Sequence, residues 1–169
     1  SGMDHASGWW QGHEAWSNLC AGGTMGVVYG AGSLWNWILF PGEPGHQSWT
    51  VAPDSGWREA LDFSGSTYVG NIGRILNKYD TYGALPNWRI APAKRTIFAP
   101  NQFFMIYLPK GGSAWFSPFR DELPPNYRVY DPKTGMEVGS GATGEVIESG
   151  SLATESSEAA ISLTAAVDS

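Results

Sequence analysis

The stretch Gly22–Trp37, with the sequence GGTMGVVYGAGSLWNW, sets the main expectation for the fold of this chain. Its short apolar run, Met25–Tyr29, stops at Gly30 and opens into a loop of Gly, Ser, Trp and Asn. Such a run is typical of a strand buried in a parallel sheet, and loops at strand ends commonly carry ligand sites. We therefore predict a buried strand over 25–29, followed by a ligand-binding loop.

Two tryptophans in this loop are candidate binding residues. Trp35 and Trp37 lie two positions apart, so on an extended segment their side chains would share one face. Paired indoles offer a flat apolar platform on which a sugar ring can stack. The alternative is that both indoles pack in the core or in a lid, and the sequence does not separate the two interpretations.

Helices are expected on both sides of this stretch. Residues 13–21 carry apolar positions at helical spacing, and the pair Gly22-Gly23 ends the pattern. A second helical region begins near Trp57 and is interrupted at 64–66. Its later apolar face, which should pack on the predicted strand, consists of Val69, Ile72, Ile75, Leu76 and Tyr79.

The second half of the chain has a different pattern. Short β-rich runs cover 95–99, 103–108, 113–116, 127–130, 144–148 and 161–167, with turn sequences between them. This spacing predicts a small antiparallel sandwich. Phe103–Leu108 is continuously apolar, which places it centrally, and DPKTG at 131–135 reads as a tight turn. We divide the chain into an α/β segment, 3–90, and a β-sandwich domain, 91–169.

Composition excludes several classes of function. The formal net charge is −6, and an acidic chain repels nucleic acid. The sequence has no run of 18 apolar residues that would indicate a membrane span. It also has no dinucleotide-binding or phosphate-loop motif that would indicate a cofactor. His5, His13 and His46 do not have the spacing of a metal site. The single cysteine, Cys20, reads as a buried thiol in a helix.

Three segments carry a family resemblance: Gly22–Trp37, the WREAL sequence Trp57–Leu61, and Tyr130–Gly135. From roughly Gly12 to Leu163, the chain resembles the late part of the catalytic barrel of apiosidase-like glycoside hydrolases and the small β domain that follows it. That β domain has been named collagen-binding, although nothing in these residues supports collagen as a ligand. The resemblance implies an α+β chain: the C-terminal fragment of a TIM-type (β/α) barrel, then an antiparallel β-sandwich.

The length of the chain limits what this resemblance implies. A complete (β/α)₈ barrel needs on the order of 200 residues, whereas roughly 90 precede the β domain here. We expect the last quarter to third of the barrel, with the catalytic carboxylates upstream, so no catalytic residue is assigned and an enzymatic activity of this chain is left open. A partial barrel should pair with a second copy, as a homo-oligomer, or lean on the β domain.

The resemblance implies that Tyr29, Trp35 and Trp37 form part of the substrate-binding wall, because barrel active sites lie at the carboxyl ends of the strands. In the long loop 38–56, His46 and Trp49 are further candidates, and Glu43 is the acidic residue placed to reach a site. The expected partner is an oligo- or polysaccharide, and the compartment that the family implies is secreted or periplasmic. Two alternatives remain: a non-catalytic carbohydrate-binding module using Trp35, Trp37 and Trp49, or a structural interaction module.

Overall fold

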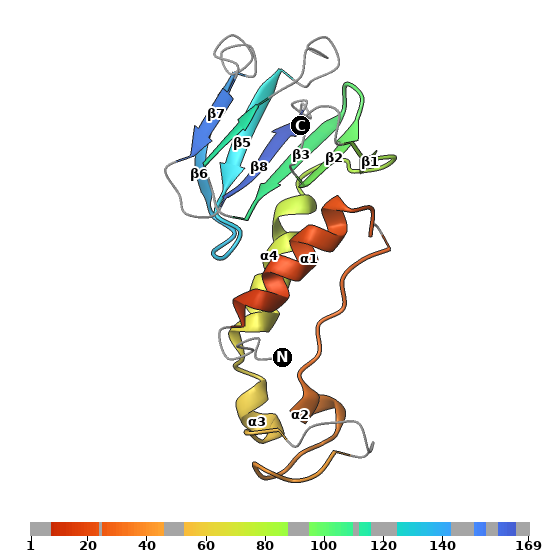
Figure 1. The fold of residues 1–169 in the computed structure, drawn as a ribbon, viewed down its shortest axis with the longest axis vertical. Helices are drawn as coiled ribbons and strands as arrows, with labels where there is room; N and C mark the ends of the chain where they lie inside the picture. Colours follow the sequence, from red (N-terminus) through yellow and green to blue (C-terminus); the bar gives the residue numbers. More distant parts are fainter. Residues whose placement is uncertain are drawn as a thin grey trace.

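The computed structural model describes residues 8–23, 25–45, 53–87, 95–109, 112–115, 125–142, 151–154 and 159–164. Two long helices, α1 (Trp9–Cys20) and α4 (Ser64–Leu76), lie side by side with one end against a β-sheet. Two short helices, α2 (Gly32–Trp35) and α3 (Trp57–Ala60), lie at the opposite end of the molecule (Figure 1). None of the helices described is long and apolar enough to cross a membrane.

The predicted helix over 13–21 is confirmed, and it begins four residues earlier, at Trp9. Its end follows from the two glycines. Gly22 adopts a left-handed φ of 102° and donates from its N–H to the Leu19 carbonyl at 3.0 Å, while Gly23 donates to the Asn18 carbonyl at 2.8 Å. These two bonds form a Schellman motif, which satisfies the last carbonyls of the helix.

The second helical region is divided at a different point from the one predicted. The break falls at 61–63, and Ser64, Gly65 and Ser66 open α4 instead of interrupting it. The Ser66 hydroxyl donates to the Phe63 carbonyl at 2.8 Å, which stabilises the first turn. The apolar face of α4 was predicted correctly at Ile72 and Ile75, both of which are buried.

The prediction of a buried strand over 25–29 is wrong. Residues 25–30 form no strand and make no backbone hydrogen bond to any other described residue, and Val28 is 89% exposed. A strand is defined by a hydrogen-bonded neighbour, and no described strand lies beside this stretch. Val27 packs against the core, while Met25 is fully exposed, so only one side of the stretch is covered.

The sheet contains six antiparallel strands in the order β1-β2-β3-β8-β5-β6, and a separate pair is formed by β4 and β7. Their bounds are β1 Leu85–Pro86, β2 Arg95–Ala99, β3 Phe103–Leu108, β4 Gly112–Trp115, β5 Asn126–Tyr130, β6 Glu137–Ala142, β7 Ser151–Thr154 and β8 Ala159–Thr164. The antiparallel β region is therefore confirmed, with β3 in the middle as predicted. The predicted run over 144–148 lies outside the described residues.

The sequence pattern missed β6 and placed the start of β8 too late. β6 has the sequence EVGSGA, in which glycine and serine replace the expected alternation of apolar residues. β8 begins at Ala159, two residues before the predicted start, in a segment read as part of a loose loop. Both strands are specified by pairing with β5, since the pairing partner supplies what local propensity does not.

One hydrophobic cluster joins the helices to the sheet. It includes Trp16 and Ile75 from the helices and Phe103, Tyr107 and Tyr130 from the sheet. The cluster thus contains residues from both sides of residue 90, where we predicted a domain boundary. The helices and the sheet share buried surface, whether or not they form separate domains. On the other face of β3, Phe104, Ile106 and Leu108 are buried as well, which accounts for its continuously apolar sequence.

Candidate functional site

The end of the molecule far from the sheet carries most of the predicted site residues. The stretch that follows α1 runs beside the helices to α2, and the chain then turns to α3 (Figure 1). Two contacts tie this end together: the Ser33 hydroxyl donates to the Ser55 carbonyl at 2.7 Å, and the Trp57 N–H donates to the Ile38 carbonyl at 2.7 Å. We call this region, residues 29–45 and 53–65, the aromatic end.

Tyr29 lies against the first turn of α4. A Cβ atom at Gly65 would lie 2.7 Å from Cε2 of the Tyr29 ring, so a larger residue there would push the ring away. Burial raises the pKa of the Tyr29 hydroxyl above its ordinary value of 10.0. The hydroxyl therefore stays protonated near neutral pH and is available as a hydrogen-bond donor.

Trp35 and Trp37 are both exposed, at 66% and 70%, but they do not share one face in the way predicted. Trp35 belongs to helix α2, where neighbouring side chains do not alternate, and its indole covers Gly30 so closely that a Cβ there would overlap the ring. Trp37 follows the helix with a left-handed φ of 52°. Because a bulky residue rarely adopts this conformation, Trp37 is a strained position of the kind found at ligand sites.

Trp37 has a different aromatic partner, which the sequence did not indicate. Its ring centroid lies 6.2 Å from that of Trp57, at an interplanar angle of 66°. The guanidinium carbon of Arg58 lies 4.6 Å from the centroid of the Trp57 ring. The WREAL motif that contains both residues was used only to place a helix. The contact of Trp57 with Trp37 joins residues 20 positions apart in the sequence, so no local signal revealed it.

The acidic candidate of this loop has a local role. An oxygen of the Glu43 carboxylate accepts a hydrogen bond from the Leu39 N–H at 2.9 Å, which stabilises the 39–43 turn. His46 and Trp49, the remaining candidates, lie outside the described residues. Among the residues that are described, no three His, Cys, Asp or Glu side chains come together in a way that could hold a metal ion.

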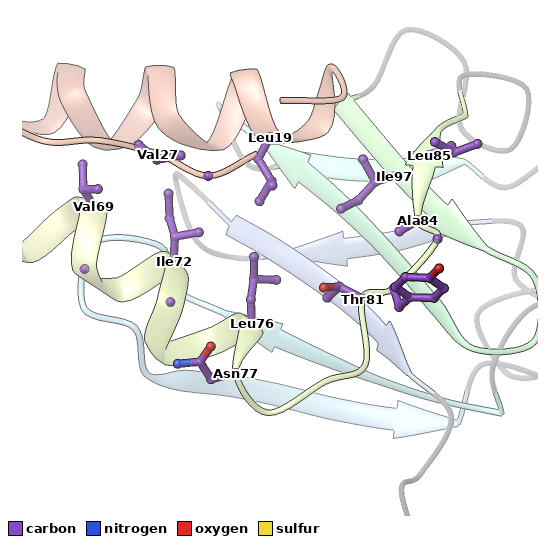
Figure 2. Close-up of a pocket in the computed structure, with 15 residues that line it drawn as sticks. Leu19, Val27, Val69, Ile72, Leu76, Asn77, Thr81, Ala84, Leu85 and Ile97 are labelled. Atoms are coloured by element: carbon purple, nitrogen blue, oxygen red, sulfur yellow. The ribbon is translucent and has the colours of Figure 1, made fainter. Parts of the chain in front are cut away.

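A hollow lies nearer the sheet. It is an apolar groove of about 750 Å³ between the end of α1, residues 26–27, α4 and the segment 81–85. Figure 2 shows Leu19 and Ile97 on one side facing Ile72 and Leu76 on the other. None of the predicted site residues lines this groove. A sugar site needs several polar groups to fix the ligand, so the groove fits apolar packing better than sugar binding.

Comparison with known proteins identifies the first half of the chain. Residues 8–83 match the family model described as "Apiosidase-like, catalytic domain". Over these residues the chain is similar to the apiosidase-like family. This apiosidase-like segment contains both long helices and the whole aromatic end, and it stops just before β1. The family resemblance read from Gly22–Trp37 and Trp57–Leu61 is therefore confirmed.

Solved structures extend the similarity to the fold of the whole chain. A protein described as a glycoside hydrolase aligns with a TM-score of 0.68 at 15% identity, over 96% of this chain and 38% of its own. A glycoside hydrolase family 5 protein from Bacteroides vulgatus aligns with a TM-score of 0.68 at 14% identity, over 94% and 36% of the two chains. This chain thus spans little more than a third of either protein. No curated protein matches it.

Proposed function

We propose that this chain is the C-terminal part of a glycoside hydrolase-like protein that acts on glycosidic bonds of a polysaccharide. In this proposal the aromatic end forms part of the wall of the sugar-binding site. The observation that carries it is the position of the exposed tryptophans: Trp35 and Trp37 follow the 25–30 stretch within the apiosidase-like segment. Barrel active sites lie at that end of the strands.

The side chains of the aromatic end suit a sugar ring. The apolar C–H face of a pyranose can stack on an exposed indole, and Trp37 with its neighbour Trp57 offers two indoles set at an angle. Tyr29 supplies a neutral hydroxyl, and Arg58, held against Trp57, supplies guanidinium donors to sugar oxygens. These residues would bind and orient the sugar. They would not break the bond.

Bond cleavage requires groups that we do not assign in this chain. Glycoside hydrolysis usually uses two carboxyl groups that flank the scissile bond, and the one acidic candidate of the loop, Glu43, already bonds to Leu39. The chain also spans only 38% and 36% of the two structural relatives. We infer that the catalytic carboxylates belong to a further part of the barrel and that this chain alone is not a complete catalyst.

The exposed stretch 25–30 supports the same inference. It lies between α1 and α4 in the chain and both helices pack together beside it, which is the order of a βα barrel unit. In such a unit the strand has parallel neighbours on both sides, whereas residues 25–30 have no described backbone partner. We propose that this stretch takes the place of a barrel strand and that further βα units, or a second copy of the chain, cover it.

A non-catalytic carbohydrate-binding module is the second candidate. Exposure of Trp35 and Trp37 favours it, because a binding platform of this kind needs no catalytic carboxylates. The two candidates differ in one respect: the first predicts that hydrolysis appears when the rest of a barrel is supplied, and the second predicts that it never does.

The test is sugar binding by calorimetry with a panel of plant polysaccharide oligosaccharides, together with an assay for released reducing ends. We expect binding by the wild-type chain, at least tenfold weaker binding by Trp37→Ala, and no hydrolysis by either. Phe40→Ala is the matched control, because Phe40 is an equally exposed aromatic residue of the same loop. Equal losses in both variants would contradict the assigned platform, and hydrolysis by the wild-type chain would contradict its incompleteness.

A further inference from the structure

The turn between β5 and β6 is unusually well defined by its own hydrogen bonds. Asp131 Oδ1 accepts from the Lys133 N–H at 2.8 Å, and Oδ2 accepts from the Thr134 hydroxyl at 2.9 Å. The Gly135 N–H donates to the Asp131 carbonyl at 2.8 Å, with Gly135 at a left-handed φ of 71°. Side chain and backbone therefore fix this turn in one conformation.

This turn contacts helices α1 and α4 of the apiosidase-like segment. The fully buried Asn71 of α4 donates from Nδ2 to the Lys133 carbonyl at 2.6 Å, across 62 residues of sequence. A Cβ at Gly135 would lie 2.9 Å from Asn71 Oδ1, so only glycine allows this approach. The Nζ of Lys133 lies 5.0 Å from the ring centroid of Trp9 in α1, so the turn contacts both helices.

A purely structural role does not explain why α4 buries Asn71 at this position. Its Oδ1 is buried without a hydrogen-bond partner among the described residues, and burial of an unpaired acceptor destabilises the folded state. An apolar residue would avoid this cost, but it would also lose the single directional bond to the turn. A buried polar group of this kind is best explained by the fixed register that it imposes between two elements.

The register of α4 bears directly on the aromatic end. Gly65, on which the Tyr29 ring rests, lies on the same helix as Asn71, six positions or about 9 Å along the axis. Tyr68, between them, packs edge-on against Trp9 with ring centroids 5.3 Å apart. A shift of α4 relative to the turn therefore displaces the surface that supports Tyr29, and with it the α3 segment that carries Trp57.

We propose that Asn71 is a positioning residue for the sugar-binding site: through its bond to the 131–135 turn, the β domain sets the place of α4 and hence of Tyr29 and Trp57. This inference rests on the proposed function for its biological meaning. Its structural claim stands apart, because the coupling between the turn and the aromatic end is measurable without any sugar.

The test is hydrogen–deuterium exchange on the full chain. In Asn71→Ala we expect the hydrogen-bonded backbone amides of 34–38 and 57–66 to exchange about tenfold faster than in the wild type, because the support of the aromatic end is loosened. Thr96→Ala is the matched control: Thr96 is also fully buried and also donates from its side chain to a backbone carbonyl, that of Asn87, at the sheet. Equal exchange at 34–38 in the two variants, at equal loss of thermal stability, would overturn the proposal.

Gly135→Ala disrupts the same contact from the other side and serves if Asn71→Ala does not fold. We expect the double variant to lose less Tm than the sum of the two single losses, because removal of the Asn71 side chain makes room for the new Cβ. Strict additivity would count against the contact. Sugar binding then separates the two proposals: a wild-type chain that binds no sugar but shows the exchange coupling refutes the site and keeps the positioning role.

Discussion

The junction of helices and sheet and the aromatic end are built from the same kinds of residue, yet they differ in nearly every physical respect. At the junction Trp16 is 0% exposed and stacks on Tyr107, with ring centroids 6.0 Å apart. At the aromatic end Trp35 and Trp37 are 66% and 70% exposed. The apolar surface of the junction is already covered by the chain itself, whereas the aromatic end leaves apolar surface open to a ligand or to another polypeptide.

The largest expected effect comes from removing one tryptophan from each region. Trp16→Ala should lower the free energy of unfolding by about 3–5 kcal/mol, because a large buried side chain and its stacking on Tyr107 are lost. Trp35→Ala should change it by less than about 1 kcal/mol, since most of that side chain already contacts water. Urea denaturation measures both, and similar losses would show that the aromatic end is covered in solution.

The pH dependence of stability tests how completely the junction is buried. Burial raises the pKa of the Cys20 thiol from 9.0 to about 12. Above pH 9 the unfolded thiol loses its proton while the folded thiol keeps it, so stability falls as pH rises from about 9 to 12, by up to ~1.4 kcal/mol per pH unit. Denaturation of the wild type and of Cys20→Ala at pH 8 and pH 11 isolates the contribution of the Cys20 thiol to the free energy of unfolding, because the other titrating groups are common to both proteins. Parallel pH profiles would mean that Cys20 is open to solvent.

A smaller loss of stability is expected from two valine substitutions, one of a buried and one of an exposed side chain. Val129→Ala, in β5, should cost about 1–2 kcal/mol because that side chain is buried, whereas Val28→Ala should cost less than about 0.5 kcal/mol. Unfolding by urea tests the stabilities, and light scattering gives the molar mass. If Val28→Ala costs as much as Val129→Ala and the wild type has twice the mass of one chain, a second copy covers residues 25–30.

Local signals predicted those parts of the fold whose cause is local. Gly22 and Gly23 marked the end of α1, because a left-handed residue there satisfies the last carbonyls. The apolar sequence of Phe103–Leu108 placed β3 at the centre of its sheet, since both faces are buried. The failure at 25–29 has an equally clear reason: the apolar pattern was real, but a strand requires a partner that the described chain does not contain.

The candidate site was predicted only in part. Tyr29, Trp35 and Trp37 were named from composition, order and family resemblance, but the alternation that would align the two tryptophans failed because Trp35 is helical. Trp57 and Arg58 were missed as site residues, since Trp57 meets Trp37 across 20 positions of sequence and Arg58 joins the site through its contact with Trp57.

The sequence by itself indicated the similarity of residues 8–83 to the apiosidase-like family, the helices that glycine and apolar spacing define, and the antiparallel character of the second half. Only the tertiary structure decided that the helices and the sheet share one core, that Trp37 meets Trp57, and that the 131–135 turn is seated on Asn71. The division has one physical reason. Caps, turns and periodicity act within a few residues, whereas these contacts join residues 20 to more than 60 positions apart, and no local pattern encodes them.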